Sequence, residues 1–283
     1  MTNTGITKAY DKTVGTNIVK QLTKTAKSEN GMGEVLEKTL EKSGLPAKGV
    51  QIIDISKMKD IELTAPYGEK ILKSVNNQIS ELFIKELENN PITKPLFKNL
   101  TQNPNIKEGL ASVFDQKLAP IFSKGNNAAC LFSTNKILLD SKKIGYAGFH
   151  EIGHAMNRNL SKTGKILQNM RGLKLLTPVL LMTALLTNKR TAENPPQTRW
   201  QKTKNFIKEN VGKLTAFLCM PIFVEEIMAS LKGQKLAKSI LPKNLMKNVT
   251  KTHILSAASY FCFMLLTGFA AFAANKVRDK IAH

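Results

Sequence analysis

The sequence predicts a mainly α-helical fold with a small β hairpin, joined to membrane helices. Three observations support this prediction. Apolar side chains recur at helical spacing through much of the first half of the 283-residue chain. Two short apolar runs separated by three polar residues indicate a hairpin near the middle. Three uncharged apolar segments follow in the second half, where the composition becomes membrane-like.

The chain is strongly basic, with 42 Lys and Arg against 21 Asp and Glu and a formal net charge of +21. Such a charge attracts nucleic acid or anionic lipid. Because the lysines are spread along the whole chain, without a nucleic-acid-binding motif, we expect solvated faces and attraction to membrane lipid, with nucleic acid a minor alternative. Three cysteines, an odd number, argue against a disulfide framework. The N-terminus lacks the apolar core of a signal peptide, so we expect this region in the cytoplasm.

The first 122 residues are interpreted as a basic, mainly helical soluble region of unknown role. Mixed helical periodicity is found over 16–27 and 32–43, and the run GVQIIDIS at 49–56 predicts a short strand. Residues 68–89 place apolar side chains on one face of an amphipathic helix, which predicts core packing. Residues 106–122 predict another helix.

The hairpin is predicted from the apolar runs at 129–132 and 136–139, which flank Ser133, Thr134 and Asn135. It precedes a helix that carries the pattern H-E-x-x-H. A strand at this position could offer an extended substrate an edge with which to pair. Packing against the following helix is an equally good interpretation.

The pattern H-E-x-x-H is formed by His150, Glu151 and His154, and it contains two of the four histidines in the chain. Positions i and i+4 share one face of a helix, so the two imidazoles can bind one metal ion. Glu151 then stands beside the metal, where it can accept a proton from a bound water. The glycines of the run 145–148 give the chain a place to turn, and Gly153 leaves room for a substrate or a second helix.

Three apolar segments follow, at 175–187, 214–224 and 254–274. The third is long enough to span a bilayer, which takes about 20 apolar residues. The first two are short and predict either a membrane hairpin, buried core helices or re-entrant pieces. The stretches 188–210 and 232–253 between these segments are basic and are interpreted as loops, so the positive-inside rule does not orient the chain.

A catalytic zinc usually takes three protein ligands. The metzincin family is excluded, because its pattern needs glycine and histidine at the positions of Asn157 and Leu160. His253 and His283 are not obvious ligands. Glu225 and Glu226, at the end of the second apolar segment, are better candidates, because carboxylates in apolar surroundings are usually paired or functional.

We favour Glu226 as the third ligand, because helical periodicity places it on a face with Ala229, Ser230 and Gly233. These residues are small, so a second helix can approach closely there. Glu225 shares a bulkier, more solvent-like face. The other interpretation is that both carboxylates mark the emergence of the helix into water, paired with Lys232.

The order of these motifs resembles that of the membrane gluzincin metallopeptidases, the HtpX-like and CAAX-processing proteases and the YugP-type neutral zinc peptidases. In those families a helix with two histidines is paired with a later glutamate in an E-x-x-A-D or E-x-D-A-S setting. Here Glu226 begins the sequence E-I-M-A-S, with Met228 at the aspartate position. The resemblance covers about residues 128–235 and implies a zincin-like helix core. It also implies a zinc site formed by His150, His154 and Glu226.

The expected function is therefore a membrane-associated zinc-dependent endopeptidase with Glu151 as the general base. An additional donor to the oxyanion would be Tyr146 or His253, candidates by position alone. The domain prediction places the catalytic region at 123–235, interrupted by the apolar hairpin, and a membrane segment and basic tail at 236–283. A catalytically inactive membrane scaffold that retains the peptidase fold is the alternative. The expected partners are a peptide or protein substrate and lipid of the cytoplasmic membrane.

Overall fold

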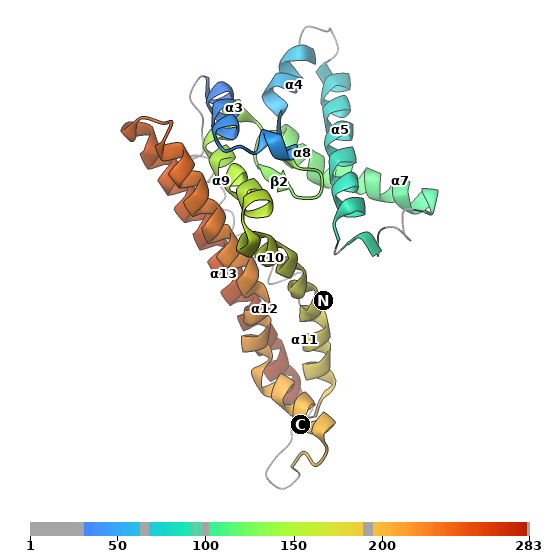
Figure 1. The fold of residues 1–283 in the computed structure, drawn as a ribbon. Coiled ribbons are helices and arrows are strands. Elements are labelled where there is room, and N and C mark those ends of the chain that lie inside the picture. The colour runs from blue at the N-terminus through green and yellow to red at the C-terminus, as the bar shows by residue number, and fades with distance from the viewer. Residues whose placement is uncertain are drawn as a thin grey trace. The chain divides into compact units, whose positions relative to one another are not determined.

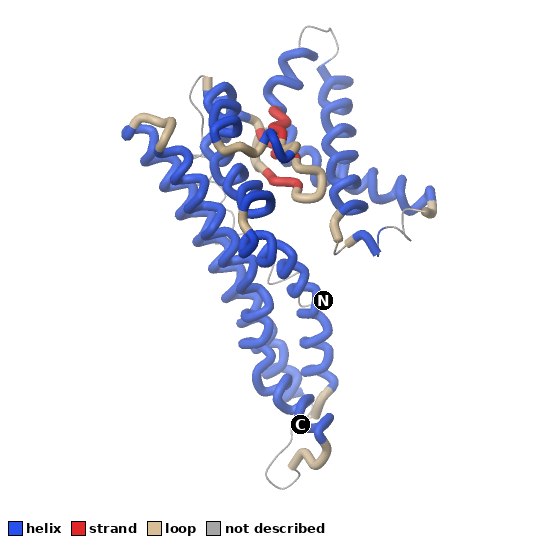
Figure 2. The backbone as a smooth tube through the Cα atoms, viewed as in Figure 1, coloured by secondary structure: helices blue, strands red, loops and turns tan. Residues whose placement is uncertain are grey.

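The protein is mainly helical and contains one small three-stranded sheet, as predicted (Figures 1 and 2). The structure is a computed structural model that describes residues 31–62, 68–91, 93–95, 97, 102–188 and 195–281. The helix predicted over 16–27 lies outside the described residues. The predicted domain boundaries at 122 and 235 stay a prediction.

The chain divides into two compact units. As far as their residues are described, the helix-pair unit comprises Ile166–Glu226 and Ser256–His283, and the sheet unit comprises Val19–Lys165 and Ile227–Leu255. Two long helices belong in part to each unit. The boundary within the first of these helices lies directly after Glu226.

The sheet has the strand order β1-β3-β2. β1 (Gln51–Asp54) runs parallel to β3 (Lys136–Leu139), and β2 (Ala129–Leu131) runs antiparallel to β3 (strands red in Figure 2). The predicted hairpin and the predicted strand within 49–56 are therefore confirmed. The hairpin turns at Asn135, which has a positive φ of 53°.

Two hydrophobic cores belong to the sheet unit, and β3 contributes to both because alternate side chains of a strand point to opposite faces. Ile137 and Leu139 join the core that contains α3 (Met32–Lys42) and α9 (Ser141–Leu160). Leu138 joins the core that contains Val75, Ile79 and Phe122. These last three residues come from α5 (Gly68–Asn89) and α8 (Ala119–Ser123).

The helices predicted in the first half are confirmed where they are described. α5 has the predicted bounds, and its buried Glu86 accepts hydrogen bonds from the backbone N–H groups of Ser133 and Thr134, at 2.8–3.1 Å. This carboxylate therefore fixes the hairpin turn to the helix. The segment predicted over 106–122 is helical in three consecutive pieces: α7 (Pro104–Val113), a π-helical turn η3 (Phe114–Leu118) and α8. A further short helix, α4 (Ile55–Glu62), directly follows β1.

In the helix-pair unit, α12 (Arg199–Lys238) and α13 (Lys243–Ile281) pack closely where two glycines meet. A Cβ added at Gly212 would lie 2.8 Å from the carbonyl oxygen of Gly268. Farther along both helices Lys208 contacts Asp279, and because 208 precedes 212 while 279 follows 268, the pair is antiparallel. The unit also contains η4 (Arg171–Leu176), α11 (Thr177–Leu186) and most of α10 (Lys162–Met170).

The prediction of loops over 188–210 and 232–253 is wrong for most of these residues, which belong to α12 and α13. α12 begins at Arg199, directly after a stretch with two prolines, and α13 begins at Lys243. The basic stretches are rich in Lys, which is a good helix former, so their charge does not interrupt the helices. The segment 214–224 is accordingly an internal part of α12, and the two glutamates that follow it do not lie at a helix end.

Two described helices, α12 and α13, are long and apolar enough to cross a membrane. The predicted span 254–274 lies inside α13. α11 has ten residues, about 15 Å at 1.5 Å per residue, which is half the thickness of a bilayer core. Because η4 (Arg171–Leu176) continues directly into α11, the helical stretch extends over 171–186, and the membrane hairpin of 175–187 and 214–224 stays a prediction. Only 17% of the apolar window of α13 is buried, so most of its side chains face outward.

Candidate metal centre

The first turns of α9 are anchored by two aspartates. The side chain of Asp140 caps the helix by accepting from the Lys143 N–H at 3.1 Å. Asp54, at the end of β1, accepts from both the backbone N–H and the hydroxyl of Ser141, at 3.1 and 2.5 Å. The residues 145–148 are helical, and the chain bends just before them at Ile144, whose φ and ψ of −131° and 33° mark a kink where two helical pieces meet.

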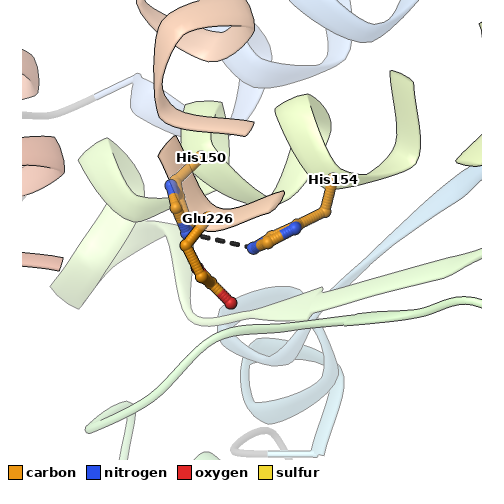
Figure 3. A group of neighbouring side chains, drawn as sticks. All are labelled: His150, His154 and Glu226. Atoms are coloured by element: carbon orange, nitrogen blue, oxygen red, sulfur yellow. Dashed lines mark hydrogen bonds between the residues drawn. The ribbon is translucent and has the colours of Figure 1, made fainter. Parts of the chain in front are cut away.

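His150 and His154 lie one helical turn apart on α9, and both are buried. Their Nε2 atoms are 3.0 Å apart (Figure 3). Tetrahedral zinc with Zn–N bonds of about 2.0–2.1 Å would separate two ligand nitrogens by about 3.3 Å. The two imidazoles therefore already converge at nearly the spacing that a shared metal ion requires.

Glu226 completes a group that could hold a metal ion. One candidate ligand atom from each of His150, His154 and Glu226 lies within 4.8 Å of the others, and all three side chains are buried (Figure 3). The structure thus brings together the two histidines and the glutamate proposed from the sequence. Glu151, the proposed base, is 8% exposed and follows His150 in the same helix.

The approach of α12 to α9 depends on two glycines. A Cβ at Gly153 would lie 2.0 Å from the carbonyl oxygen of Ala229, and a Cβ at Gly233 would lie 2.1 Å from that of Phe149. Any larger residue would force the two backbones apart. The interpretation of Gly153 and of the small face of α12 as a helix contact is therefore confirmed. Because Glu226 is one turn from Ala229 in the same helix, this contact also sets the position of Glu226.

Ser230 was not singled out from the sequence as more than a small residue. Its hydroxyl lies 3.1 Å from Nδ1 of His150. When Nδ1 donates its proton to this hydroxyl, the lone pair of Nε2 is free for a metal. Ser230 is the last residue of the E-I-M-A-S run, so its spacing of four residues from Glu226 was the available sequence signal.

Glu225 is fully buried, so the expectation of a solvent-like face is wrong, and so is the interpretation that the pair marks a helix emerging into water. Arg171 binds both glutamates: Nη1 lies 2.9 Å from Oε2 of Glu225, and Nη2 lies 3.0 Å from Oε1 of Glu226. Gln168 donates to the other oxygen of Glu225 at 2.8 Å. Arg171 thereby bridges two carboxylates that are adjacent in the chain, and its positive charge offsets their mutual repulsion.

Sequence analysis missed Arg171 and Gln168, because they precede the apolar segments and belong to no motif around the two glutamates. The carboxylates of Glu151, Glu225 and Glu226 and the guanidinium of Arg171 have a formal sum of −2. A metal cation bound by His150, His154 and Glu226 would add positive charge beside Glu226.

His253, in α13, is buried and its ring centroid lies 5.5 Å from that of His150. Neither ring nitrogen has a hydrogen-bond partner in good geometry among the described residues. The pKa of His253 is lowered to about 3, mainly by burial and also by the nearby His150 and His154, while the backbone of Ser230 partly opposes this shift. His253 is thus a neutral imidazole next to the candidate metal ligands. Tyr146, the other candidate donor, is fully buried in the core with Phe149 and Ile152.

The hairpin also reaches this centre. The ring of Phe132, the residue after β2, lies 6.0 Å from the ring of His154 in an edge-to-face arrangement. β2 pairs only with β3 among the described strands, so its other edge carries no strand. The sheet therefore presents an edge beside the helix of the two histidines.

Neither a protein-family model, nor a curated protein, nor a solved structure matched the chain. The resemblance to the membrane gluzincins therefore rests on the sequence motifs alone.

Proposed function

We propose that the protein is a membrane-bound zinc endopeptidase. The observation that carries the proposal is the convergence of His150, His154 and Glu226, all buried, within 4.8 Å. Two imidazoles and a carboxylate are a ligand set typical of catalytic zinc, because three protein ligands leave one position for water or substrate. The spacing of the two Nε2 atoms supports a metal ion of this kind.

In this proposal Glu151 is the general base. It accepts a proton from the attacking water and later delivers it to the leaving amine. A bound zinc would lower the pKa of water to about 7 and polarise the substrate carbonyl. His253 is the second donor: its neutral imidazole can present an N–H to the developing oxyanion. Ser230 keeps His150 in the tautomer that a metal requires.

The outer edge of β2, with which no other described strand pairs, is the proposed substrate-binding edge. An extended peptide that added a strand there would make backbone hydrogen bonds with Ala129–Leu131. Phe132 would then direct the peptide past His154. Such main-chain pairing selects an unfolded or extended segment and is largely independent of side-chain identity.

The membrane part of the proposal rests on the spacing of polar groups in the helix-pair unit. Lys208 and Glu226 are 18 residues apart in α12, about 27 Å at 1.5 Å per residue. This separation is close to the thickness of about 30 Å of a bilayer core. The charged Glu209 and Lys213 also lie in the interval, but within about 8 Å of Lys208 along the helix, where a lysine side chain can still reach the headgroups. The span 254–274 of α13 packs against the same stretch through Gly268 and Phe261, which contact Gly212 and Phe223. We therefore propose that the centre lies near one surface of a membrane, which we take to be the cytoplasmic membrane.

The test is metal analysis and cleavage of labelled casein by the full-length protein in detergent. Wild type should bind about one zinc per chain and cleave; His150→Ala and Glu226→Gln should lose the metal, whereas the control Glu209→Gln, an exposed position of α12, should retain it. Glu151→Gln should keep zinc and lose cleavage, since only the base is removed. Equal cleavage by wild type and Glu151→Gln would refute the mechanism. Absence of metal from the wild type would refute the zinc site and favour a membrane scaffold.

A further inference from the structure

A groove in the helix-pair unit lies outside the candidate metal centre. It has a volume of about 410 Å³, in the size range of ligand pockets. Its lining comprises two threonines together with Pro178, Val179, Met182 and Leu186 of α11 and Trp200 and Lys204 of α12. The groove is thus apolar along its length, and Lys204 is the one cationic side chain among the described residues of its wall.

The apolar residues of the groove are not covered by other described residues. Trp200 is 63% exposed and Leu186 is 76% exposed, and Val179 and Met182 are each more than half exposed. A contiguous apolar surface of this kind is costly in water and indicates an apolar occupant. The groove extends along α11 from Thr187 to Pro178, about 14 Å at 1.5 Å per residue, which suits an elongated chain.

The charge around the groove indicates an anionic occupant. The Nζ of Lys204 lies 5.1 Å from the centre of the Trp200 ring, so the cation sits directly beside the apolar lining. Lys208 contacts Asp279, which brings the start of α12 and the end of α13 to the same end of the helix pair. Within 199–209 and 275–281 seven side chains are cationic and two are anionic.

Tryptophan and lysine together at the end of an apolar helix pair are typical of a membrane interface, where the indole lies at headgroup depth and the ammonium meets phosphate. We propose that this groove binds one anionic phospholipid, with an acyl chain along α11 and the phosphate at Lys204. The proposal rests on the membrane part of the proposed function and is independent of the peptidase chemistry. Free phosphate would leave the apolar wall uncovered, and a neutral lipid would not use the excess of positive charge around Lys204.

Trp200 is the single tryptophan of the chain, so its fluorescence reports on this groove alone. The full-length protein is reconstituted in vesicles of phosphatidylcholine that contain a small fraction of phosphatidylglycerol. Bromine atoms, which quench tryptophan on contact, are placed on the acyl chains of one lipid or of the other. Preferential binding should make quenching by brominated phosphatidylglycerol roughly fivefold stronger per lipid than quenching by brominated phosphatidylcholine, the factor expected for one lysine near an anionic headgroup.

Lys204→Gln should abolish this preference, whereas Lys202→Gln, a charge-matched change on the same helix outside the groove, should retain it. Val179→Phe, which fills the groove, should weaken quenching by both lipids, and its circular dichroism should show that the helices persist. Inorganic phosphate at millimolar concentration should leave the preference unchanged. Equal quenching by the two lipids in the wild type would overturn the proposal. So would an unchanged preference in Lys204→Gln.

The absence of quenching by either lipid would also overturn it, by placing Trp200 outside the bilayer. None of these results tests the peptidase proposal, which depends on the metal content and on the activity of the Glu151→Gln variant.

Discussion

The backbone of Gly153 lies directly against the carbonyl of Ala229, at a distance that leaves no room for a side chain. A methyl group added at Gly153 would lie 2.0 Å from that oxygen. Gly153→Ala should therefore displace α12 from α9, weaken metal binding and destabilise the protein by about 2 kcal/mol or more. Metal titration and thermal unfolding in detergent measure both effects.

The matched control is Gly109→Ala in α7, where an added Cβ would meet no atom within 4 Å. Because alanine favours a helix over glycine by about 1 kcal/mol, this control should be neutral or stabilising. A Gly153→Ala protein with unchanged stability and metal affinity would contradict the helix contact.

Ser230→Ala should weaken zinc binding without eliminating it. The change removes the hydroxyl that lies 3.1 Å from Nδ1 of His150, and loss of such a partner typically lowers metal affinity by about 10-fold or more. The measurement is a zinc competition titration with a chelating dye. Ser239→Ala, an exposed position near the end of α12, serves as the control and should bind zinc normally.

Arg171→Gln should destabilise the metal-free protein by about 3 kcal/mol, because it leaves Glu225 and Glu226 buried without their shared cation. Adding Glu225→Gln to this variant should restore much of the loss, since one of the two charges is removed. Zinc should raise the unfolding midpoint of Arg171→Gln more than that of the wild type, because the metal replaces the missing positive charge. Equal midpoints for all three metal-free proteins would contradict this pairing.

His253→Gln should lower kcat for casein by about 100-fold while changing zinc affinity little. The reason is that His253 lies beside His150 without belonging to the ligand group, and loss of one oxyanion donor costs about 10²–10³ in kcat. Steady-state kinetics and a zinc titration of the same preparation separate the two quantities. Loss of zinc in this variant would instead make His253 a ligand.

Asp279→Asn should destabilise the helix-pair unit by about 3 kcal/mol, because Lys208 is 2% exposed and would lose its anionic partner. Lys208→Met combined with Asp279→Asn should be more stable than Asp279→Asn alone. Burial raises the pKa of Asp279, but the hydrogen bond and charge of Lys208 outweigh it and leave the pKa below 3.8. The stabilisation is therefore present above pH 3.8 and should be lost as the pH falls through the lower folded-state value, which acid unfolding of the wild type beside Asp279→Asn tests.

The parts of the fold that could be predicted from sequence are those governed by local pattern. α5 was predicted from amphipathic periodicity over its 22 residues, and the hairpin was predicted from two apolar runs on either side of the turn that contains Asn135. The extent of α12 and α13 could not be predicted in the same way, because their ends are polar and basic. A polar helix and a polar loop have similar compositions, and only packing against the rest of the chain distinguishes them.

In the candidate centre, too, the residues that could be predicted are those with a local sequence signal. His150 and His154 are one helical turn apart with Glu151 between them, and Glu226 was favoured because its face is small, so each had a local signal. Arg171 had none, because its two partners lie more than 50 residues later and no periodicity connects them. The burial of Glu225 likewise depends on that arginine.

The candidate ligands are separated by 72 residues, from His154 to Glu226, and α10, α11 and the first 27 residues of α12 lie between them. A ribosome that adds about 5–20 residues per second completes this interval in about 4–14 seconds. During that time a nascent chain contains both histidines but lacks the glutamate. The metal-binding group can therefore close only after the intervening helices have been synthesised, which delays its assembly beyond the emergence of the histidine helix.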